Sequence, residues 1–170
     1  MTDHPDDLHE VFLNPGDFHF GGGSTRISTL LGSCVSITLW HPRRRIGGMC
    51  HYMLTGRQRP AGAPLDGRYG DEAFALFLER VAAAGTRPGE YQAKLFGGAN
   101  MLADPAADTI DIGRRNVALG HELLARHHIP LLAEHVGGSG RRKLHFDLWR
   151  GDVWLAFPQG SNARIRNING

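Results

Sequence analysis

The sequence predicts an α+β layered sandwich built from mixed, largely antiparallel sheets. Several short segments alternate apolar and polar residues, the period of a half-buried strand, whereas only two segments carry apolar residues at helical spacing. The strands and helices do not alternate strictly along the chain, which argues against a purely parallel sheet. A length of 170 residues with 41% hydrophobic content favours one domain over residues 1–170 with a single substantial core.

The strands are expected at regular intervals along the chain. Residues 1–10 are polar and predict a flexible lead-in, and residues 11–20 read as a strand interrupted at Asn14–Pro15–Gly16. The clearest alternation is VSITLW at 35–40, where three apolar residues are separated by Ser36 and Thr38. The remaining strands are expected at 26–31, 46–54, 91–98, 129–136, 142–149 and 152–157.

Two helices are expected, at 71–84 and 114–128. In the first, Phe74, Phe77 and Val81 recur at helical spacing, and Gly85 and Pro88 follow as stop signals. Between the strands and this helix lies a Pro/Gly-rich segment at 59–70, too long to be a simple connector.

Composition excludes several classes of protein. A net charge of +2 is too small to indicate binding to nucleic acid or to a membrane surface. No apolar run approaches the ~20 residues that span a bilayer, and the acidic first residues are unlike a signal peptide. With only Cys34 and Cys50, a disulfide-rich scaffold is excluded. We therefore expect a cytoplasmic protein with free thiols and no membrane insertion.

The segment STLLGSCVSITLWHPRRRIGGMCHYML carries the candidate chemistry. If the strands around a loop at 41–44 form a hairpin, paired residue numbers add up to 85 and Cys34 lies opposite His51. Cross-strand partners have Cβ atoms about 4.5–5.5 Å apart on one face, the geometry of a Cys–His nucleophile–base pair. A bulge at Gly47–Gly48 would shift this register and bring Cys50 forward instead.

The residues before the cysteine add a second reason. Gly32 allows a tight turn, so amide N–H groups around Gly32, Ser33 and Cys34 could face a substrate carbonyl and stabilise an oxyanion. A cysteine is nevertheless often a small buried hydrophobe, and a strand histidine is often a packed core residue. The residues by themselves leave both interpretations open.

Five segments resemble, in order, those of the chemoreceptor glutamine deamidase family (CheD). They are TLLGSCVSI, GGMCHYML, KLFGGANM, IGRRN and a final GGSGRR before a strand pair, together spanning roughly residues 11–158. The resemblance implies hydrolysis of glutamine side-chain amides to glutamate, with release of ammonia, on the cytoplasmic helices of methyl-accepting chemotaxis receptors. It implies a Cys–His–Thr site without metal or organic cofactor, in a fold similar to the catalytic domains of deamidating bacterial toxins.

Carried over by position, the nucleophile is Cys34 and the general base is His51. The third family residue is a threonine six positions before the cysteine, which here is Ser28, with Thr29 beside it. Spacing favours Ser28 as the residue that orients His51, and Thr29 is the alternative. Further candidates for an orienting or substrate-groove role are Gly32, Ser33, Lys94, Gly97 and Gly98.

Other hypotheses stay open from the sequence. A chain of this family could act as a non-catalytic adaptor that binds receptors or a response-regulator phosphatase, or an amine could replace water as the acceptor. A Cys34–Cys50 disulfide would inactivate the thiol. Ten histidines raise the question of zinc, but the absence of CxxC and HExxH motifs gives such a site little support.

Overall fold

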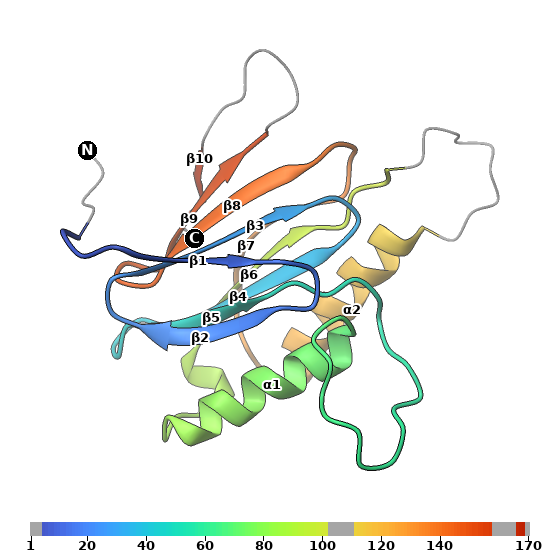
Figure 1. Ribbon diagram of the computed structural model, residues 1–170, viewed down its shortest axis with the longest axis horizontal. Helices are drawn as coiled ribbons and strands as arrows, with labels where there is room; N and C mark the ends of the chain where they lie inside the picture. Colours follow the sequence, from blue (N-terminus) through green and yellow to red (C-terminus); the bar gives the residue numbers. More distant parts are fainter. Residues whose placement is uncertain (1–4, 102–110, 158–165, 169–170) are drawn as a thin grey trace.

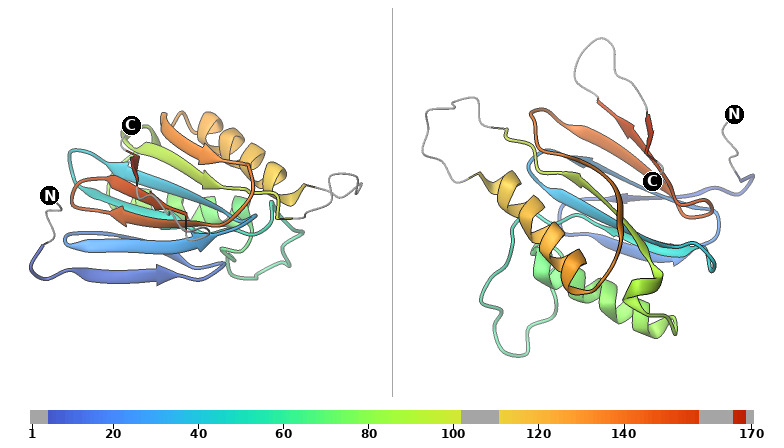
Figure 2. Two further views of the ribbon diagram at one scale, coloured as in Figure 1. Left: turned by 90° about the horizontal axis from the view of Figure 1, so that it is seen from above. Right: turned by 180° about the vertical axis from the view of Figure 1, so that it is seen from behind.

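The computed structural model describes residues 5–101, 111–157 and 166–168, which form two five-stranded sheets and two helices in three layers (Figures 1 and 2). The predicted α+β layered class is therefore confirmed. Both sheets are mixed, because β1 runs parallel to β3 and β6 runs parallel to β7 whereas the other pairs are antiparallel.

The first sheet has the order β1-β3-β8-β9-β10 and the second has the order β2-β5-β4-β6-β7. The strands of the first sheet are β1 (His9–Leu13), β3 (Thr25–Leu31), β8 (Arg142–Asp147), β9 (Asp152–Ala156) and β10 (Arg166–Ile168). Those of the second sheet are β2 (Phe18–Gly22), β4 (Val35–His41), β5 (Ile46–Cys50), β6 (Gln92–Gly97) and β7 (Leu131–Val136). The sequence analysis missed β10, and the predicted lead-in was too long because His9 and Glu10 belong to β1; residues 1–4 lie outside the described residues.

The helices are α1 (Gly70–Ala83) and α2 (Ile112–Arg126), and a 3₁₀ turn covers Pro88–Glu90. Both helices lie within two residues of their predicted positions. They pack on one face of the second sheet (Figure 2). There their buried residues join those of β4, β5 and β6 in one apolar cluster. The other face of that sheet packs against the first sheet. In the described part of the chain, no helix is long and apolar enough to cross a membrane.

The β4–β5 hairpin has a different register from the predicted one. His41 pairs with Ile46 and Trp40 pairs with Gly47, so paired residue numbers add up to 87, and the turn begins one residue later than expected. Arg45 closes it with a φ of 52° and an N–H bond to the His41 carbonyl at 2.8 Å. A shift of two residues keeps every side chain on its original face, and the one-residue bulge considered at Gly47–Gly48 does not occur.

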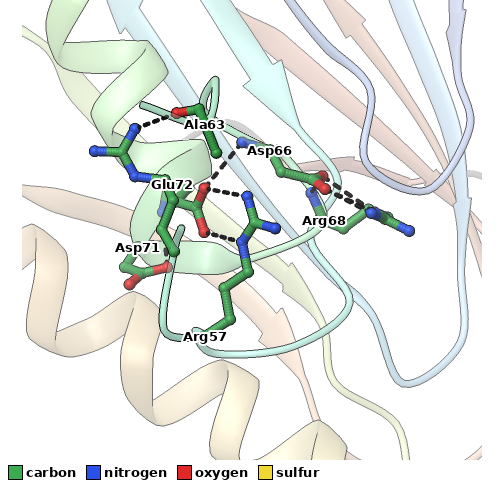
Figure 3. A network of polar contacts seen from close by, with 7 residues as sticks. Arg57, Ala63, Asp66, Arg68, Asp71 and Glu72 are labelled. Carbon is green, nitrogen blue, oxygen red and sulfur yellow. Dashed lines mark hydrogen bonds and ion pairs between the residues drawn. The ribbon is translucent and has the colours of Figure 1, made fainter. Parts of the chain in front are cut away.

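The long loop before α1 is held by a buried carboxylate (Figure 3). Glu72 accepts two hydrogen bonds from the Arg57 guanidinium, at 3.0 and 3.1 Å, and one from the Asp66 N–H at 3.1 Å. Arg57 lowers the pKa of Glu72, and Arg68 lowers the pKa of Asp66 to about 2. Because Glu72 lies in the first turn of α1, the helix dipole also favours its charge. The loop is thereby fixed to the helix.

Replacing Glu72 by alanine is expected to loosen this loop, because Arg57 and the Asp66 N–H lose their shared acceptor. Trypsin should then cut at the loop arginines several times faster than in the wild type, about threefold or more. The matched control is Glu79→Ala, an exposed carboxylate on the same helix. Equal cleavage rates for the Glu72 variant, the control and the wild type would show that the loop does not depend on Glu72.

Candidate active site

A threonine in the interior fixes the histidine of the candidate site. Thr29 lies between the buried Ile27 and Leu31 on the inward face of β3, and its Oγ1 is 2.7 Å from His51 Nδ1. The same hydroxyl donates its hydrogen to the Leu13 carbonyl at 2.8 Å. A hydroxyl has one proton to donate, so the second bond must be donated by the Nδ1–H of His51. This leaves the lone pair on Nε2.

His51 is therefore a buried neutral base. Its side chain is 2% exposed, and its Nε2 is buried with no hydrogen-bond partner among the described residues. Burial lowers its pKa to about 4, opposed by the charge of Asp17. Its backbone is also fixed, because the Gly16 N–H donates to the His51 carbonyl at 2.8 Å. At neutral pH the imidazole can accept a proton at Nε2 without first losing one.

The prediction that Ser28 orients His51 is wrong. Ser28 is on the opposite face of β3, because successive strand residues point to opposite sides. Its Oγ is 2.6 Å from Nδ1 of His145, its cross-strand partner on β8. Thr29, the alternative, makes the contact. The sequence held a signal for this. In an alternating strand Ser28 is on the same face as the charged Arg26, whereas Thr29 is on the same face as the apolar Ile27.

Cys34 and His51 face the same interior layer. Cys34 packs against the apolar cluster between the two sheets, the layer in which His51 meets Thr29. Val35 and Tyr52 exchange two backbone hydrogen bonds of 3.0 Å, so the strand segments next to Cys34 and His51 are paired. In this register Cys34 lies diagonal to His51, not directly opposite as predicted. Diagonal neighbours on one face have Cα atoms about 7–8 Å apart and remain within reach of longer side chains.

Cys50 does not share this environment. It belongs to the cluster under the helices, burial raises its pKa to about 12, and its thiol lies 3.9 Å from the Ile37 carbonyl. Both cysteines are free thiols. Because Cys34 and Cys50 pack on opposite faces of the second sheet, the geometry does not support the disulfide considered from the sequence.

The loop that carries the thiol is held by its carbonyl groups. The Ala99 N–H donates to the Gly32 carbonyl at 3.0 Å, and the Gly98 N–H donates to the Cys34 carbonyl at 2.9 Å. Gly97 must lack a side chain, because a Cβ there would lie 2.2 Å from the Cys34 carbonyl oxygen, and its φ is +105°. Gly97 and Gly98 therefore pack closely against the backbone of the loop that carries Cys34, and Gly98 holds its carbonyl.

A buried asparagine holds the remaining carbonyl. Asn116 Nδ2 donates to the Ser33 carbonyl at 3.3 Å and to the Met53 carbonyl at 2.8 Å. Asn116 is fully buried on α2, a role that the sequence analysis did not assign to it. The sequence spacing could have indicated this burial. Asn116 lies four residues before Gly120 and seven before Leu123, which are also buried, and residues at these spacings share one helical face.

These bonds orient the amides of the loop. In a trans peptide the N–H points opposite to the preceding carbonyl. The Gly32 and Ser33 carbonyls point toward Ala99 and Asn116. The N–H groups of Ser33 and Cys34 therefore point away from them. Burial raises the pKa of the Cys34 thiol, and the N–H of Cys34 itself opposes that shift. The thiol is thus protonated at rest, with an amide donor beside its sulfur.

Lys94 does not fit the groove role considered for it. It is 5% exposed, and its ammonium donates to the Gly151 carbonyl in the β8–β9 turn at 3.1 Å. It therefore connects the two sheets in the interior, and burial lowers its pKa. Within the described ranges, no group of three His, Cys, Asp or Glu side chains is placed to hold a metal ion.

Comparisons with known proteins agree on one family. The CheD family, described as "CheD chemotactic sensory transduction", matches residues 53–157. A "Probable chemoreceptor glutamine deamidase CheD 3" from Dechloromonas aromatica is 75% identical over the full length of both chains. Proteins named "Probable chemoreceptor glutamine deamidase CheD" include one from Pseudomonas fluorescens, 49% identical over 86% of this chain and 83% of its own.

A likeness to a solved structure is much weaker. The "hypothetical protein YfiH" of Bacillus licheniformis overlays with a TM-score of 0.43 at 13% identity, covering 80% of this chain and 60% of that one. The sequence relatives are thus the informative comparison.

The buried neutral imidazole should make stability depend on pH. His51 has a pKa of about 4 in the folded protein against an ordinary 6.5, so below pH 6.5 the unfolded chain binds a proton that the folded chain does not. Its contribution should lower the free energy of unfolding by about 2 kcal/mol on going from pH 7 to pH 5. Urea titrations of the wild type and of His51→Gln at both pH values measure this. Equal pH slopes in the two proteins would contradict a buried neutral His51.

Proposed function

The chain belongs to the CheD family, and from that premise we propose that it is a chemoreceptor glutamine deamidase in which Cys34 is the nucleophile and His51 the general base and acid. The substrate is the side-chain amide of specific glutamines on the cytoplasmic part of chemotaxis receptors, and the products are glutamate and ammonia. The enzyme would accordingly act in the cytoplasm. No metal or organic cofactor is needed for this chemistry.

One observation carries the assignment of the residues. His51 has its Nδ1–H bonded to Thr29 and an unpartnered Nε2 in the buried layer that also holds Cys34. A buried polar atom without a partner costs free energy, and a structural histidine gains nothing from it. A base that must accept a thiol proton requires such an atom. The arrangement therefore supports a Cys–His pair better than a packed core histidine.

In the first step, His51 Nε2 takes the proton of the Cys34 thiol, and the thiolate attacks the amide carbon of glutamine. The carbonyl electron pair moves onto oxygen, where the N–H groups of Cys34 and Ser33 are oriented to stabilise the negative charge. The protonated imidazole then gives its proton to the amide nitrogen, the C–N bond breaks, and ammonia leaves a thioester on Cys34.

In the second step, water replaces ammonia. His51 Nε2, neutral again, takes a proton from water as the oxygen attacks the thioester carbon. The C–S bond breaks, the imidazolium returns its proton to sulfur, and the new carboxylic acid is released and loses its proton to solvent to give glutamate. Throughout both steps Thr29 accepts the Nδ1–H bond, which keeps the imidazole in the tautomer that presents Nε2. Thr29 is thus a positioning residue.

The buried environment favours proton transfer coupled to attack. The pKa of Cys34 is raised and that of His51 is lowered by burial, so the resting pair is neutral thiol and neutral imidazole. Charge separation then develops only as the substrate is attacked, when the loop amides can stabilise it. Binding to a response-regulator phosphatase rests on the family resemblance alone and would be a separate function.

Replacing Cys34 with alanine should abolish deamidation, because no other thiol reaches the interior layer. Peptide mass spectrometry of a receptor cytoplasmic fragment measures this, since each converted glutamine gains about one dalton. Cys50→Ala is the matched control and should remain active. Receptor binding without any mass change in the wild type would instead support the non-catalytic adaptor, and incorporation of an added amine would indicate transglutamination.

The two adjacent hydroxyls should have different effects. Thr29→Val removes the acceptor of the His51 Nδ1–H bond, and we expect ammonia release to slow by about tenfold or more. Thr29→Ser keeps the hydroxyl and should retain most activity, and Ser28→Ala should stay within about twofold of the wild type. Greater loss in Ser28→Ala than in Thr29→Val would restore the spacing-based assignment.

A further inference from the structure

Exposed apolar side chains gather around the candidate nucleophile. Among the described residues seven large hydrophobic side chains are exposed, and four of them lie in segments that border the Cys34 loop. These four are Met53, Leu54, Met101 and Ile112, with exposed fractions between 37% and 44%. The proposed reaction uses none of them.

Met53 lies on one side of the thiol. In the second sheet β4 has β5 and β6 as its neighbours (Figure 1), and Cys34 directly precedes β4. Met53 follows the Val35–Tyr52 pair that extends the β5 side. Asn116 Nδ2 bonds both the Ser33 and the Met53 carbonyls, which fixes Met53 next to the nucleophile loop.

Met101 lies on the other side. The chain beyond β6 is fixed to the loop by the Ala99 N–H bond to the Gly32 carbonyl. A Cβ on Gly32 would lie 3.4 Å from Met101 Cγ and 3.5 Å from its Sδ, so the methionine side chain rests over the glycine. The loop that carries Cys34 thus has an exposed methionine on each side, Met53 from the segment after β5 and Met101 from the segment after β6.

Ile112 extends the apolar surface on the helix side. It is the first residue of α2 and lies one turn before Asn116, and residues four apart share a helical face. Because Asn116 contacts both the nucleophile loop and Met53, Ile112 projects from the same side of the helix. The three side chains thus come from segments that are hydrogen-bonded to the loop that carries the thiol.

We propose that Met53 and Met101, together with Ile112, form an apolar clamp that binds the apolar side chains located one helical turn before and after the target glutamine of a protein substrate. The inference rests on the proposed deamidase function and deepens it, because it assigns the residues that select a helical protein segment over free glutamine. These residues bind the substrate and take no part in proton transfer.

The spacing of the clamp fits a helix. Neighbouring strands are about 4.8 Å apart, so β5 and β6, on either side of β4, are about 10 Å apart. Seven residues of a helix rise about 10.5 Å, the separation between side chains one turn before and one turn after a central residue. Methionine is unbranched and flexible, and surfaces rich in it adapt to several partners. An enzyme acting on several glutamines needs such a surface.

The test compares the double variant Met53→Gln/Met101→Gln with wild type. Glutamine keeps a similar length but removes the apolar contact, so deamidation of a receptor cytoplasmic fragment should fall by about tenfold or more at subsaturating substrate. Alkylation of Cys34 by iodoacetamide, a small amide reagent, should stay within about twofold, because the thiol and His51 are untouched. Leu132→Gln, which changes an equally exposed residue near the far end of β7, is the matched control.

Each outcome decides between explanations. Unchanged turnover of the fragment would overturn the clamp, and so would a parallel loss of alkylation, which would assign the methionines to positioning the loop. If wild type does not deamidate the fragment, the proposed function fails. The clamp is then judged by fragment binding in the Cys34→Ala background: weaker binding in the double variant supports it, and equal binding overturns it.

Discussion

One buried hydroxyl between the sheets decides the tautomer of His51. Thr29 donates to the last carbonyl of β1 and therefore has only its lone pair left for His51. The threonine thus joins β1, β3 and the segment after β5, and it dictates which imidazole nitrogen carries the proton. If that hydroxyl pointed elsewhere, His51 would be a buried polar residue without a defined role.

The loop that carries Cys34, residues 32–34, is held through its backbone carbonyls, which accept hydrogen bonds. The carbonyls of Gly32, Ser33 and Cys34 are bound by donors from the segment after β6 and from α2. The bonds to the Gly32 and Ser33 carbonyls direct the N–H groups of Ser33 and Cys34 the other way, so the contacts that hold the loop also orient the two amides proposed to stabilise an oxyanion. This explains why a fully buried asparagine on a helix matters at a site formed by strands.

The layered architecture gives the two thiols different environments. One sheet has two faces, and Cys34 packs toward the interior of the sandwich whereas Cys50 packs toward the helices. Burial without a charged partner makes Cys50 inert, with a pKa of about 12. Around the Cys34 loop the exposed apolar residues come from the segments after β5 and β6 and from α2, so the proposed substrate surface depends on how these parts are arranged.

The sequence by itself determined the layered class, the two helices, most strands and the placement of Cys34 and His51 on one face. That shared face survived an error in the hairpin register, because a two-residue shift preserves side-chain faces whereas a one-residue shift would not. Only the tertiary structure decided that Thr29 and not Ser28 meets His51, that Lys94 is interior, and that Asn116 supports the loop. Those choices depend on which face of each element is covered, and the partner that covers it lies far away in the chain.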